Sequence, residues 1–487
     1  MIEIFTSPVV LGLIILGTAL GITVGAIPGL TGTMLIALSL PLTYSMDPVH
    51  ALVLLVSMYI GAVSGGLISA TLLRMPGTPA AIMTTLDGYP MAQAGKPGRA
   101  LGLGVGASLV GGLISWLALL LLAEPMADWS TLLGPFEYFA LVVLAQALLA
   151  GVGDSTRAKG LLAGALGILA AMPGTHPATG ELRWTFGFTS MNSGFQLIPV
   201  LIGLFAIGKI LTDIGTEEKK IEQSSGHDSS FIPLKEWLPH WRNLLRSSGI
   251  GTVIGVLPGV GANIGSLAAY AASKRASKEP EKYGHGSEEG IIASEAANNA
   301  TVGGALIPLI ALGMPGSVIT AVLLGALILH GLQPGPLLFR QNPEAVHAII
   351  GTMLIGNIVM FLLMLIGAKW IAKLSAVPRK ILSPLVFISC LWGSYALSGR
   401  WFDVFVMLGF GIAGWLMERL KLPLAPFVIG FVLAPVAEEN LCAGLMASGG
   451  SYLPLFTRPV SLVFIVLAGF LLARKETKRK KPQDLVS

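Results

Sequence analysis

Apolar runs recur along the chain as far as residue 473, with short polar loops between them. Their length of about 17 to 25 residues is what an α-helix needs to cross roughly 30 Å of hydrocarbon. The pattern of an outer-membrane barrel, alternating polarity over segments of roughly ten residues, does not occur. The sequence therefore predicts an all-α polytopic membrane protein with about 11 membrane spans.

Two of the apolar runs contain helix-breaking residues in the same arrangement. GAIPGLTGT, residues 25–33, resembles GVLPGVGAN, residues 255–263, and Gly25, Pro28 and Gly29 recur 230 positions later. A second pair follows in the same order, MPGT at 75–78 and MPGS at 314–317, which lie 239 positions apart. Self-similarity that keeps its order along a chain indicates internal repetition. We therefore predict that the protein contains two copies of one unit.

One long hydrophilic segment, residues 212–243, lies between the two copies and contains EEKKIEQSSGHDSS. Such a segment is too polar to cross hydrocarbon and is the expected linker. The sequence thus predicts a first membrane repeat at residues 1–211, a cytoplasmic linker at 212–243, a second membrane repeat with one extra C-terminal span at 244–473, and a basic cytoplasmic tail at 474–487.

Lys and Arg indicate how the two copies are oriented, because short cytoplasmic loops are enriched in them. The loop TYSMDPVH after the first break is mildly acidic, whereas its counterpart SKRASKEPEK is basic. The copies are therefore expected to be inverted-topology repeats, as in many secondary transporters. Residues 8–43 and 247–272 would each enter and leave the membrane on one side, as re-entrant hairpins or as two short tilted helices.

Only 12% of the residues are charged, and the formal net charge is +5. This charge does not indicate a nucleic-acid partner, since Lys and Arg are concentrated in short loops and in the tail RKETKRKK. Cys390 and Cys442 fall in apolar segments, where a cysteine is usually a small buried hydrophobic residue. No HExxH motif, cysteine cluster or Walker A motif occurs, so neither transition-metal chemistry nor ATP hydrolysis by a P-loop is expected.

The helix breaks are the candidate substrate site. An interrupted helix persists in hydrocarbon only where it is buried in protein or lines a water-filled cavity. A helix that begins after a break directs unpaired N–H groups and a partial positive charge toward such a cavity, which suits a carboxylate. We expect the substrate to bind at the four breaks, through Pro28, Gly29, Thr31, Gly32, Arg74, Pro76, Gly77, Thr78, Pro258, Gly259, Gly261, Pro315, Gly316 and Ser317.

Structural explanations of these residues remain open at this point. The Pro and Gly residues could produce kinks and allow close helix packing. Arg74 could clamp a substrate carboxylate through its guanidinium group, or it could interact with the C-terminus of a helix. The presence of the first break in both copies favours a binding site over a kink.

A coupling cation is expected close to the same breaks, because unwound carbonyls and side-chain oxygens are hard ligands. In SEAANNATVGG, residues 294–304, Glu295 lies within one helical turn of two asparagines. An ionisable group in a membrane span is a functional candidate, although a helix cap or an interfacial carboxylate is the alternative. Glu438, Glu439 and Asn440 form a second polar group, either an ion or proton site or an interfacial one. The candidate coupling-ion residues are Thr31, Thr33, Asn263, Ser266, Glu295, Asn298 and Asn299.

Five stretches together resemble the large membrane subunit of the tripartite tricarboxylate transporters, the TctA family: GAIPGLTGT, MPGTPAAIMTTLDGYP, GVLPGVGANIGS, SEAANNATVGGALIP and LGMPGS. The resemblance covers nearly the whole chain. It implies a multi-pass permease of the bacterial cytoplasmic (inner) membrane that works with a small four-helix membrane subunit (TctB-like) and a periplasmic solute-binding protein (TctC-like). It also implies uptake of carboxylates such as citrate, driven by an ion gradient, commonly sodium.

These observations predict ion-gradient-driven uptake of a small organic anion, a di- or tricarboxylate. Na⁺ is the expected coupling ion, H⁺ is the alternative, and no other cofactor is expected. A channel remains an alternative, although the sequence lacks a repeated acidic ring or a filter-like series of carbonyls. A non-transporting membrane scaffold is a further alternative. An intramembrane enzyme is not expected, because no Ser/His or paired-Asp signature occurs.

Overall fold

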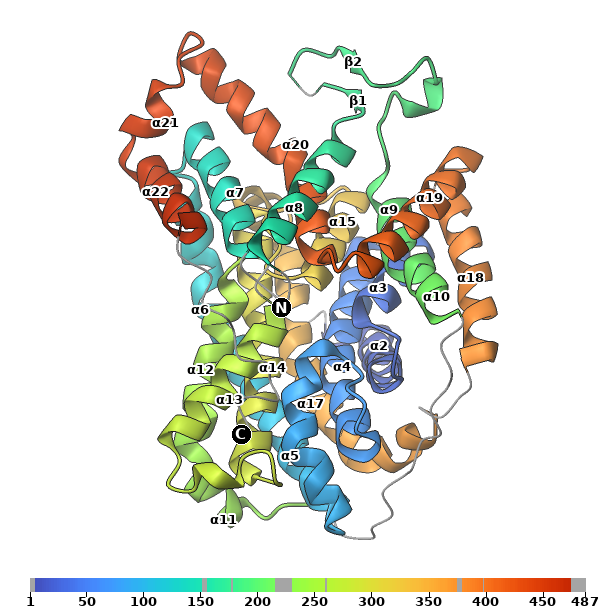
Figure 1. Cartoon of the computed structure of the whole chain (residues 1–487), viewed down its shortest axis with the longest axis vertical. Helices are drawn as coiled ribbons and strands as arrows, with labels where there is room; N and C mark the ends of the chain where they lie inside the picture. Colours follow the sequence, from blue (N-terminus) through green and yellow to red (C-terminus); the bar gives the residue numbers. More distant parts are fainter. Residues whose placement is uncertain are drawn as a thin grey trace.

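The fold is built almost entirely from α-helices. A computed structural model describes residues 5–150, 156–176, 178–214, 230–258, 261–374, 379–396 and 398–473. The predicted tail and residues 215–229 of the predicted linker lie outside this part of the chain. In the described residues the only sheet is a hairpin of β1 (Gly174–Thr175) and antiparallel β2 (Leu182–Arg183). Figure 1 shows this hairpin at the upper end of the helical body, with α5 and α11 at the lower end.

The helices fall into two groups, before and after the segment 215–229 of the predicted linker, so that α11 and the start of α12 lie within the predicted linker bounds. Those before it are α2 (Pro8–Ala26), α3 (Gly32–Thr43), α4 (Pro48–Leu73), α5 (Ile82–Gln93), α6 (Pro97–Ser130), α7 (Pro135–Ala150), α8 (Arg157–Ala171), α9 (Leu197–Ile202) and α10 (Gly208–Asp213). Those that follow are α11 (Leu234–Trp237), α12 (Trp241–Val256), α13 (Gly261–Ala276), α14 (Glu288–Leu312), α15 (Val318–Leu329), α16 (Pro336–Gln341), α17 (Pro343–Leu374), α18 (Arg379–Ala396), α19 (Trp401–Arg419), α20 (Leu424–Ala447), α21 (Leu453–Thr457) and α22 (Pro459–Ala473).

Six of the described helices are long and apolar enough to cross a membrane, namely 8–26, 48–73, 97–130, 343–368, 401–419 and 424–447. Shorter apolar helices lie at 32–43, 135–150, 318–329, 383–396 and 459–473. The expectation of an all-α, multi-pass membrane protein is therefore confirmed. The number of about 11 spans stays a prediction, because the shorter helices fall below the roughly 20 residues of a full crossing.

The helices begin at local capping signals. The Asp47 carboxylate caps α4 by accepting hydrogen bonds from the Val49 and His50 N–H groups at 2.9 and 3.3 Å, and Pro48 occupies the first turn. The Ser287 hydroxyl caps α14 by accepting a bond from Gly290 N–H at 3.2 Å. Such caps satisfy N–H groups that the first turn leaves unpaired.

All four Pro-Gly motifs coincide with a helix break. In the first pair, α2 ends at Ala26 and α12 ends at Val256, just before the prolines. In the second pair, α4 ends before Arg74 and α14 ends before Gly313, and both of these residues adopt the left-handed conformation, with φ of 53° and 68°. The breaks are thus produced locally, by proline and by residues that leave the right-handed helical region.

The first helix of each half packs against the helix that precedes the second break. A Cβ atom at Gly25 of α2 would lie 2.2 Å from the Ala62 carbonyl oxygen of α4. A Cβ atom at Gly255 of α12 would lie 2.7 Å from the Thr301 carbonyl oxygen of α14. The glycines recur 230 positions apart and their partners 239 positions apart, the same offsets as the sequence motifs. Glycine is needed here because the two backbones are almost in contact.

The two breaks within each half also touch each other. A Cβ atom at Gly77 would lie 2.0 Å from the Gly25 carbonyl oxygen, and one at Gly316 would lie 2.6 Å from the Gly255 carbonyl oxygen. Each MPG motif therefore packs directly on the end of the first helix of its own half. The closeness of these backbones excludes any larger side chain at Gly77 and Gly316 without a shift of the helices.

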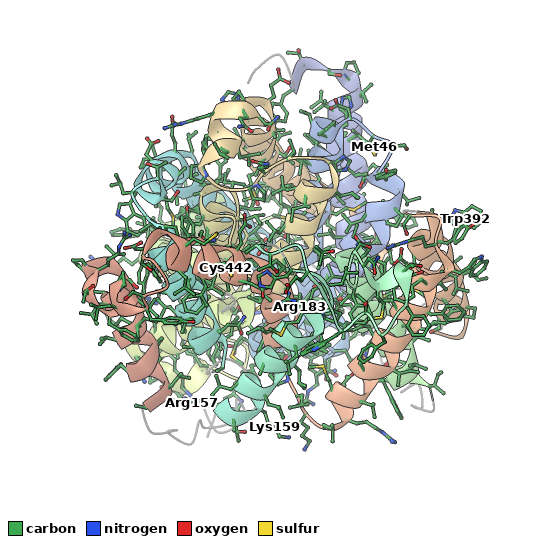
Figure 2. All side chains as sticks on the ribbon, turned by 90° about the horizontal axis from the view of Figure 1, so that it is seen from above. Met46, Arg157, Lys159, Arg183, Trp392 and Cys442 are labelled. Carbon is green, nitrogen blue, oxygen red and sulfur yellow. The ribbon has the colours of Figure 1, made fainter. Side chains whose placement is uncertain are left out.

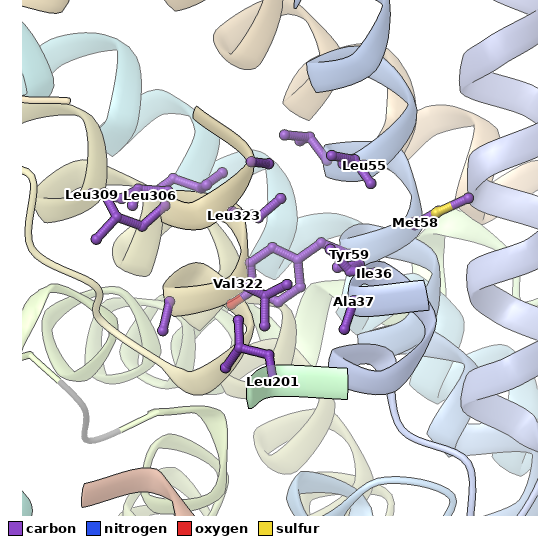
Figure 3. Close-up of a cluster of buried hydrophobic side chains, with 14 of the residues drawn as sticks. Ile36, Ala37, Leu55, Met58, Tyr59, Leu201, Leu306, Leu309, Val322 and Leu323 are labelled. Carbon is purple, nitrogen blue, oxygen red and sulfur yellow. The ribbon is translucent and has the colours of Figure 1, made fainter. Parts of the chain in front are cut away.

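The hydrophobic core joins helices from both sides of the linker. Figure 3 shows one part of it, in which Tyr59 of α4 lies among side chains of α3, α9, α14 and α15. The labelled residues are Ile36, Ala37, Leu55, Met58, Tyr59, Leu201, Leu306, Leu309, Val322 and Leu323. These side chains, together with close packing of α14 against α6, bring the breaks of the two halves into one region.

Candidate functional site

Helix α14 carries a buried polar group through the middle of the helical body. Glu295 and Asn298 have no exposed surface, and Asn299 is 1% exposed. The helix packs against α4, α5, α6, α12 and α13, which cover all of its sides. Glu295 lies two turns inside the helix and its side chain is not exposed, so it does not cap the start of α14. Polar side chains buried in this way require partners.

The Glu295 carboxylate accepts hydrogen bonds from two hydroxyls of the first half. The Thr84 hydroxyl of α5 donates to Oε1, and the Ser108 hydroxyl of α6 donates to Oε2 at 3.4 Å. Thr84 also lies 3.1 Å from the Ser294 hydroxyl, next to Glu295 in sequence. Among the described residues, no Lys, Arg or His forms an ion pair with Glu295. Neutral hydroxyls therefore surround the carboxylate.

Asn299 extends the same network toward α4. Its Oδ1 accepts a hydrogen bond from the Ser64 hydroxyl at 2.6 Å, and its Nδ2 donates to the Ser108 hydroxyl at 2.7 Å. Nδ2 also donates to the Glu295 carbonyl at 3.2 Å, one turn earlier in the helix. The network consequently connects α4, α5, α6 and α14, helices that belong to different halves of the chain.

Asn298 leaves one oxygen unpaired. Its Nδ2 donates to the Val63 carbonyl of α4 at 3.2 Å, which sets the orientation of the amide. Its Oδ1 is buried and has no hydrogen-bond partner among the described residues, and the same holds for Thr78 Oγ1. Thr78 Oγ1 lies beside α4, only 2.7 Å from the position of a Cβ atom at Gly66. Two unpaired oxygens thus approach the same turn of α4.

The hydroxyls at the breaks serve as helix caps. The Thr31 side chain accepts a hydrogen bond from Met34 N–H at 3.2 Å at the start of α3. The Ser317 side chain accepts one from Thr320 N–H at 3.2 Å at the start of α15, and Tyr59 Oη lies 3.4 Å from it. At the starts of α3 and α15, one of the N–H groups that were expected to face the substrate is therefore hydrogen-bonded to the capping side chain of its own helix.

The other predicted residues are distributed over several places. Pro28, Gly32 and Thr33 are buried at the first break, and Pro315 is buried at the fourth. Ser266 is buried on α13 and donates to the Ser294 carbonyl at 3.1 Å, which places it beside the Glu295 network. The predicted residues that are partly or fully exposed include Pro76, Pro258, Gly261 and Asn263. Gly259 lies outside the described residues.

Arg74 lies at the exposed end of α4. Its guanidinium group lies 5.5 Å from the centre of the Tyr89 ring, in the geometry of a cation–π contact. The backbone N–H group of Arg74 donates a hydrogen bond to the Ser69 carbonyl. A role as a carboxylate clamp stays a prediction, since the described contacts are with the protein itself.

A pocket opens at the first break, lined in part by Pro28, Gly29 and the Lys209–Asp213 ion pair of α10.

Asp87 is a buried residue that the sequence analysis did not single out. Its Oδ1 accepts hydrogen bonds from the backbone N–H groups of Gly284, Gly286 and Ser287, at 2.8, 3.0 and 2.8 Å. Its Oδ2 accepts a bond from the Tyr270 hydroxyl at 2.8 Å. Burial raises the pKa of the Asp87 carboxyl, and the four hydrogen bonds oppose that shift. Asp87 therefore holds the loop before α14 against α5.

Glu438 is part of an ion pair near the upper hairpin. Arg183 of β2 donates through both Nη atoms to the two carboxylate oxygens, with Nη2 at 2.9 Å from Oε2. His176 Nε2 lies 3.3 Å from Oε1. Viewed from above, Arg183 lies near the middle of the molecule, close to Cys442 (Figure 2). This pairing joins the hairpin to α20.

The hydroxyls around Glu295 were not among the predicted site residues. Thr84 lies in the second half of MPGTPAAIMTTLDGYP, for which no role was predicted. Ser64 and Ser108 are single hydroxyls within the small-residue stretches AVSGG and GASLVGG. A hydroxyl among small residues in a predicted span is a detectable signal for an interhelical hydrogen bond, because small residues let helices approach closely.

Comparison with known proteins identifies the chain. The model of the tripartite tricarboxylate transporter TctA family matches residues 11–429. An uncharacterized 52.8 kDa protein in the TAR-I ttuC' 3'region of Agrobacterium vitis is 33% identical over 482 residues, which cover 98% of this chain and 96% of that protein. An uncharacterized protein in the TAR-II ttuC' 3'region of the same organism is 37% identical over 234 residues, which cover 47% of this chain and 96% of that protein.

No solved structure matches the chain. The matched family segment nevertheless contains all four helix breaks and the buried network of α14, and the described helices are those of a multi-pass membrane protein. The resemblance drawn from the five sequence stretches is confirmed. The chain belongs to the tripartite tricarboxylate transporter TctA family and is thus a component of a transporter, not a member of an enzyme family.

Proposed function

We propose that the chain is the permease subunit of a binding-protein-dependent secondary transporter. It takes up a small organic anion, a di- or tricarboxylate, and a gradient of Na⁺ drives the uptake. One observation carries this proposal beyond family membership: each half packs its two helix breaks on each other, Gly77 on Gly25 and Gly316 on Gly255. Broken helices that meet in the interior of a transporter are typical of substrate and ion sites.

The two halves are proposed to be inverted repeats. Matching backbone contacts at Gly25 and Gly255, at the same offsets as the sequence motifs, support a common architecture. The acidic character of the loop after α3 and the basic character of the loop after α13 support opposite orientations in the membrane. Two related units of this kind can exchange conformations, which would open the site to each side in turn.

The substrate carboxylates are proposed to bind where α3, α13 and α15 begin. The caps Thr31 and Ser317 each satisfy one N–H group, and a helix start leaves four such groups without an intrahelical partner. The remaining N–H groups and the helix dipole favour a carboxylate. Tyr59 Oη, which lies 3.4 Å from Ser317 Oγ, is a further donor beside this position.

The proposed partners are a small TctB-like membrane subunit and a periplasmic TctC-like solute-binding protein, and the proposed location is the bacterial cytoplasmic membrane. Family membership supports both, since a tripartite transporter is an assembly of three components. The binding protein would deliver its ligand to the outer surface of the permease.

Reconstitution tests the function directly. The chain is co-expressed with its small membrane subunit, incorporated into proteoliposomes, and supplied with the solute-binding protein and labelled di- or tricarboxylates such as citrate. An inward Na⁺ gradient should accelerate accumulation, and unlabelled substrate inside should exchange for labelled substrate outside. Conductance without exchange would indicate a channel. Absence of carboxylate uptake in the complete system would overturn the proposal.

A further inference from the structure

The Glu295 carboxylate lies in a place where an unneutralised charge is costly. It has no exposed surface, and among the described residues its side-chain hydrogen-bond partners are the Thr84 and Ser108 hydroxyls and the Asn298 amide. Hydrogen bonds from neutral hydroxyls stabilise a carboxylate, yet they do not cancel its charge in a low-dielectric interior. A positive charge must therefore accompany Glu295 when it is ionised, and the described protein supplies none.

The same region contains acceptor atoms that lack donors. Asn298 Oδ1 is a carbonyl oxygen and cannot donate, and its amide cannot simply be turned around, because Nδ2 is engaged with the Val63 carbonyl. Thr78 Oγ1 is equally buried and without a partner among the described residues. Buried polar atoms in native proteins are rarely left unpaired, so both oxygens point to a missing ligand.

These groups converge on one place. Glu295 and Asn298 are three residues apart on α14 and share a face of the helix. Asn298 contacts α4 at Val63, and Thr78 lies against α4 at Gly66, one turn further along. Thr84 lies six residues after Thr78, beyond the short turn Pro79–Ala81 and in the first turn of α5, and it contacts Glu295 directly. Asn298 and Thr78 therefore approach one turn of α4, and the segment that carries Thr78 also carries Thr84, whose hydroxyl reaches the Glu295 carboxylate.

We propose that Glu295, Asn298 Oδ1 and Thr78 Oγ1 bind a single monovalent metal cation, with the Thr84 and Ser108 hydroxyl oxygens completing the site. This proposal rests on the proposed function, for which it defines the position of the coupling ion. Carboxylate, amide carbonyl and hydroxyl oxygens are hard ligands suited to Na⁺. Hydroxyls that donate to Glu295 keep a lone pair for the cation.

The charge of the site selects a monovalent ion. A single carboxylate balances one positive charge, whereas a divalent ion would leave an excess charge buried. Divalent sites usually combine several acidic ligands, and the described residues contain no group of three or more His, Cys, Asp or Glu side chains that could hold a metal ion. The site is therefore expected to prefer Na⁺ to Ca²⁺ or Mg²⁺.

The position of the site explains how ion and substrate binding are coupled. Thr78 and Thr84 belong to the segment after the MPGT break of the first half, whereas Glu295 and Asn298 belong to the second half. A cation that binds all four residues would order this segment against α14. The MPGT break before this segment packs through Gly77 on Gly25 of the first break, next to the proposed carboxylate site at the start of α3. Na⁺ should therefore increase carboxylate affinity, and carboxylate should increase Na⁺ affinity by the same factor.

The test is Na⁺ binding by the purified full chain in detergent without any carboxylate. Thermal unfolding is followed while NaCl replaces choline chloride at constant ionic strength, and binding of ²²Na⁺ is measured in parallel. The wild type should be stabilised by Na⁺ and bind one ion per chain. Asn298→Ala and Thr78→Val should weaken the apparent Na⁺ affinity by about tenfold to a hundredfold.

Two further variants make the result specific. Thr352→Val is the matched control, because Thr352 Oγ1 on α17 is also buried and unpaired among the described residues but lies on another helix. It should leave the Na⁺ response unchanged. Glu295→Gln imitates the neutralised carboxylate, so this variant should be as stable in choline as the wild type is in Na⁺, and should not respond to Na⁺.

Failure of the site and failure of the function have different signatures. Wild-type Na⁺ affinity in both Asn298→Ala and Thr78→Val would overturn the site, and so would a wild type that binds no Na⁺ because a proton neutralises Glu295. Na⁺-driven carboxylate uptake that survives these variants would keep the function and remove the site. Na⁺ binding that depends on them, in a protein that transports no carboxylate, would keep the site and remove the function.

Discussion

The Thr84 hydroxyl of α5 donates a hydrogen bond to Glu295 Oε1 of α14 across 211 positions of sequence. Both side chains are fully buried. The bond joins the segment after one helix break to the interior of the opposite half, and it is one of several contacts between the most polar stretch of α14 and the first half. The interior of the protein is consequently organised around a carboxylate.

Replacing Thr84 by Val should destabilise the protein and impair transport. The substitution keeps the shape of the side chain but leaves a Glu295 oxygen without its donor, at a cost of about 1–3 kcal/mol. Thermal unfolding in detergent measures this cost. Thr85→Val is the control, since the Thr85 hydroxyl is exposed and donates to the Ile82 carbonyl of its own helix. The control should change stability by less than about 0.5 kcal/mol, and equal effects of both variants would contradict the prediction.

Replacing Gly25 by Ala should prevent normal packing of α2 on α4. The new Cβ atom would lie 2.2 Å from the Ala62 carbonyl oxygen, and backbone cannot move aside as a flexible side chain can. We expect a loss of at least about 1–3 kcal/mol and a low folded yield, measured by fluorescence-detected size exclusion. Gly12→Ala, on the same helix with no atom within 4 Å of its Cβ, should fold normally. A normal yield for Gly25→Ala would show that the helices separate readily.

Replacing Asp87 by Asn should release the loop at residues 277–287. Its backbone N–H groups at Gly284, Gly286 and Ser287 would lose a charged acceptor, and hydrogen bonds to charged groups are the stronger ones. Faster trypsin cleavage at Lys282 would report the release. Glu281→Gln, an exposed change within the loop, should leave the cleavage rate as in the wild type. A slow rate in both variants would mean that other contacts hold the loop.

The Arg183–Glu438 pair should show a measurable coupling energy. Its side chains are 25% and 24% exposed, and the guanidinium contacts both carboxylate oxygens. A double-mutant cycle with Arg183→Gln and Glu438→Gln should give about 1 kcal/mol, discounted for partial exposure to solvent. The exposed Lys282–Glu279 pair, at 62% and 57%, should give a smaller coupling energy, because solvent screens it. Coupling no larger than in this control would mean that the hairpin is held by other contacts.

Several features of the candidate site were predictable because they are local. Pro28, Pro258 and the two MPG motifs mark helix ends, because proline lacks the N–H group and the adjoining glycine accepts non-helical backbone. Glu295 was recognisable because a carboxylate in a long apolar run has few alternatives to burial. In contrast, Asn263 and Ser266 are only three positions apart, yet Asn263 is exposed and Ser266 lies beside the Glu295 network. Sequence cannot separate them, because the difference lies in which face of α13 meets α14.

The sequence by itself determined the helical membrane character, the four helix breaks, the duplication of motifs and the family, because length, hydropathy and the backbone properties of Pro and Gly act locally. The tertiary structure alone decided which atoms meet. Thr84, Ser108 and Ser64 reach the polar turn of α14, and Asp87 reaches the loop before it, through the packing of helices far apart in the chain. Such contacts depend on the rotation and register of each helix, which close backbone approaches at glycines set only when the whole protein assembles.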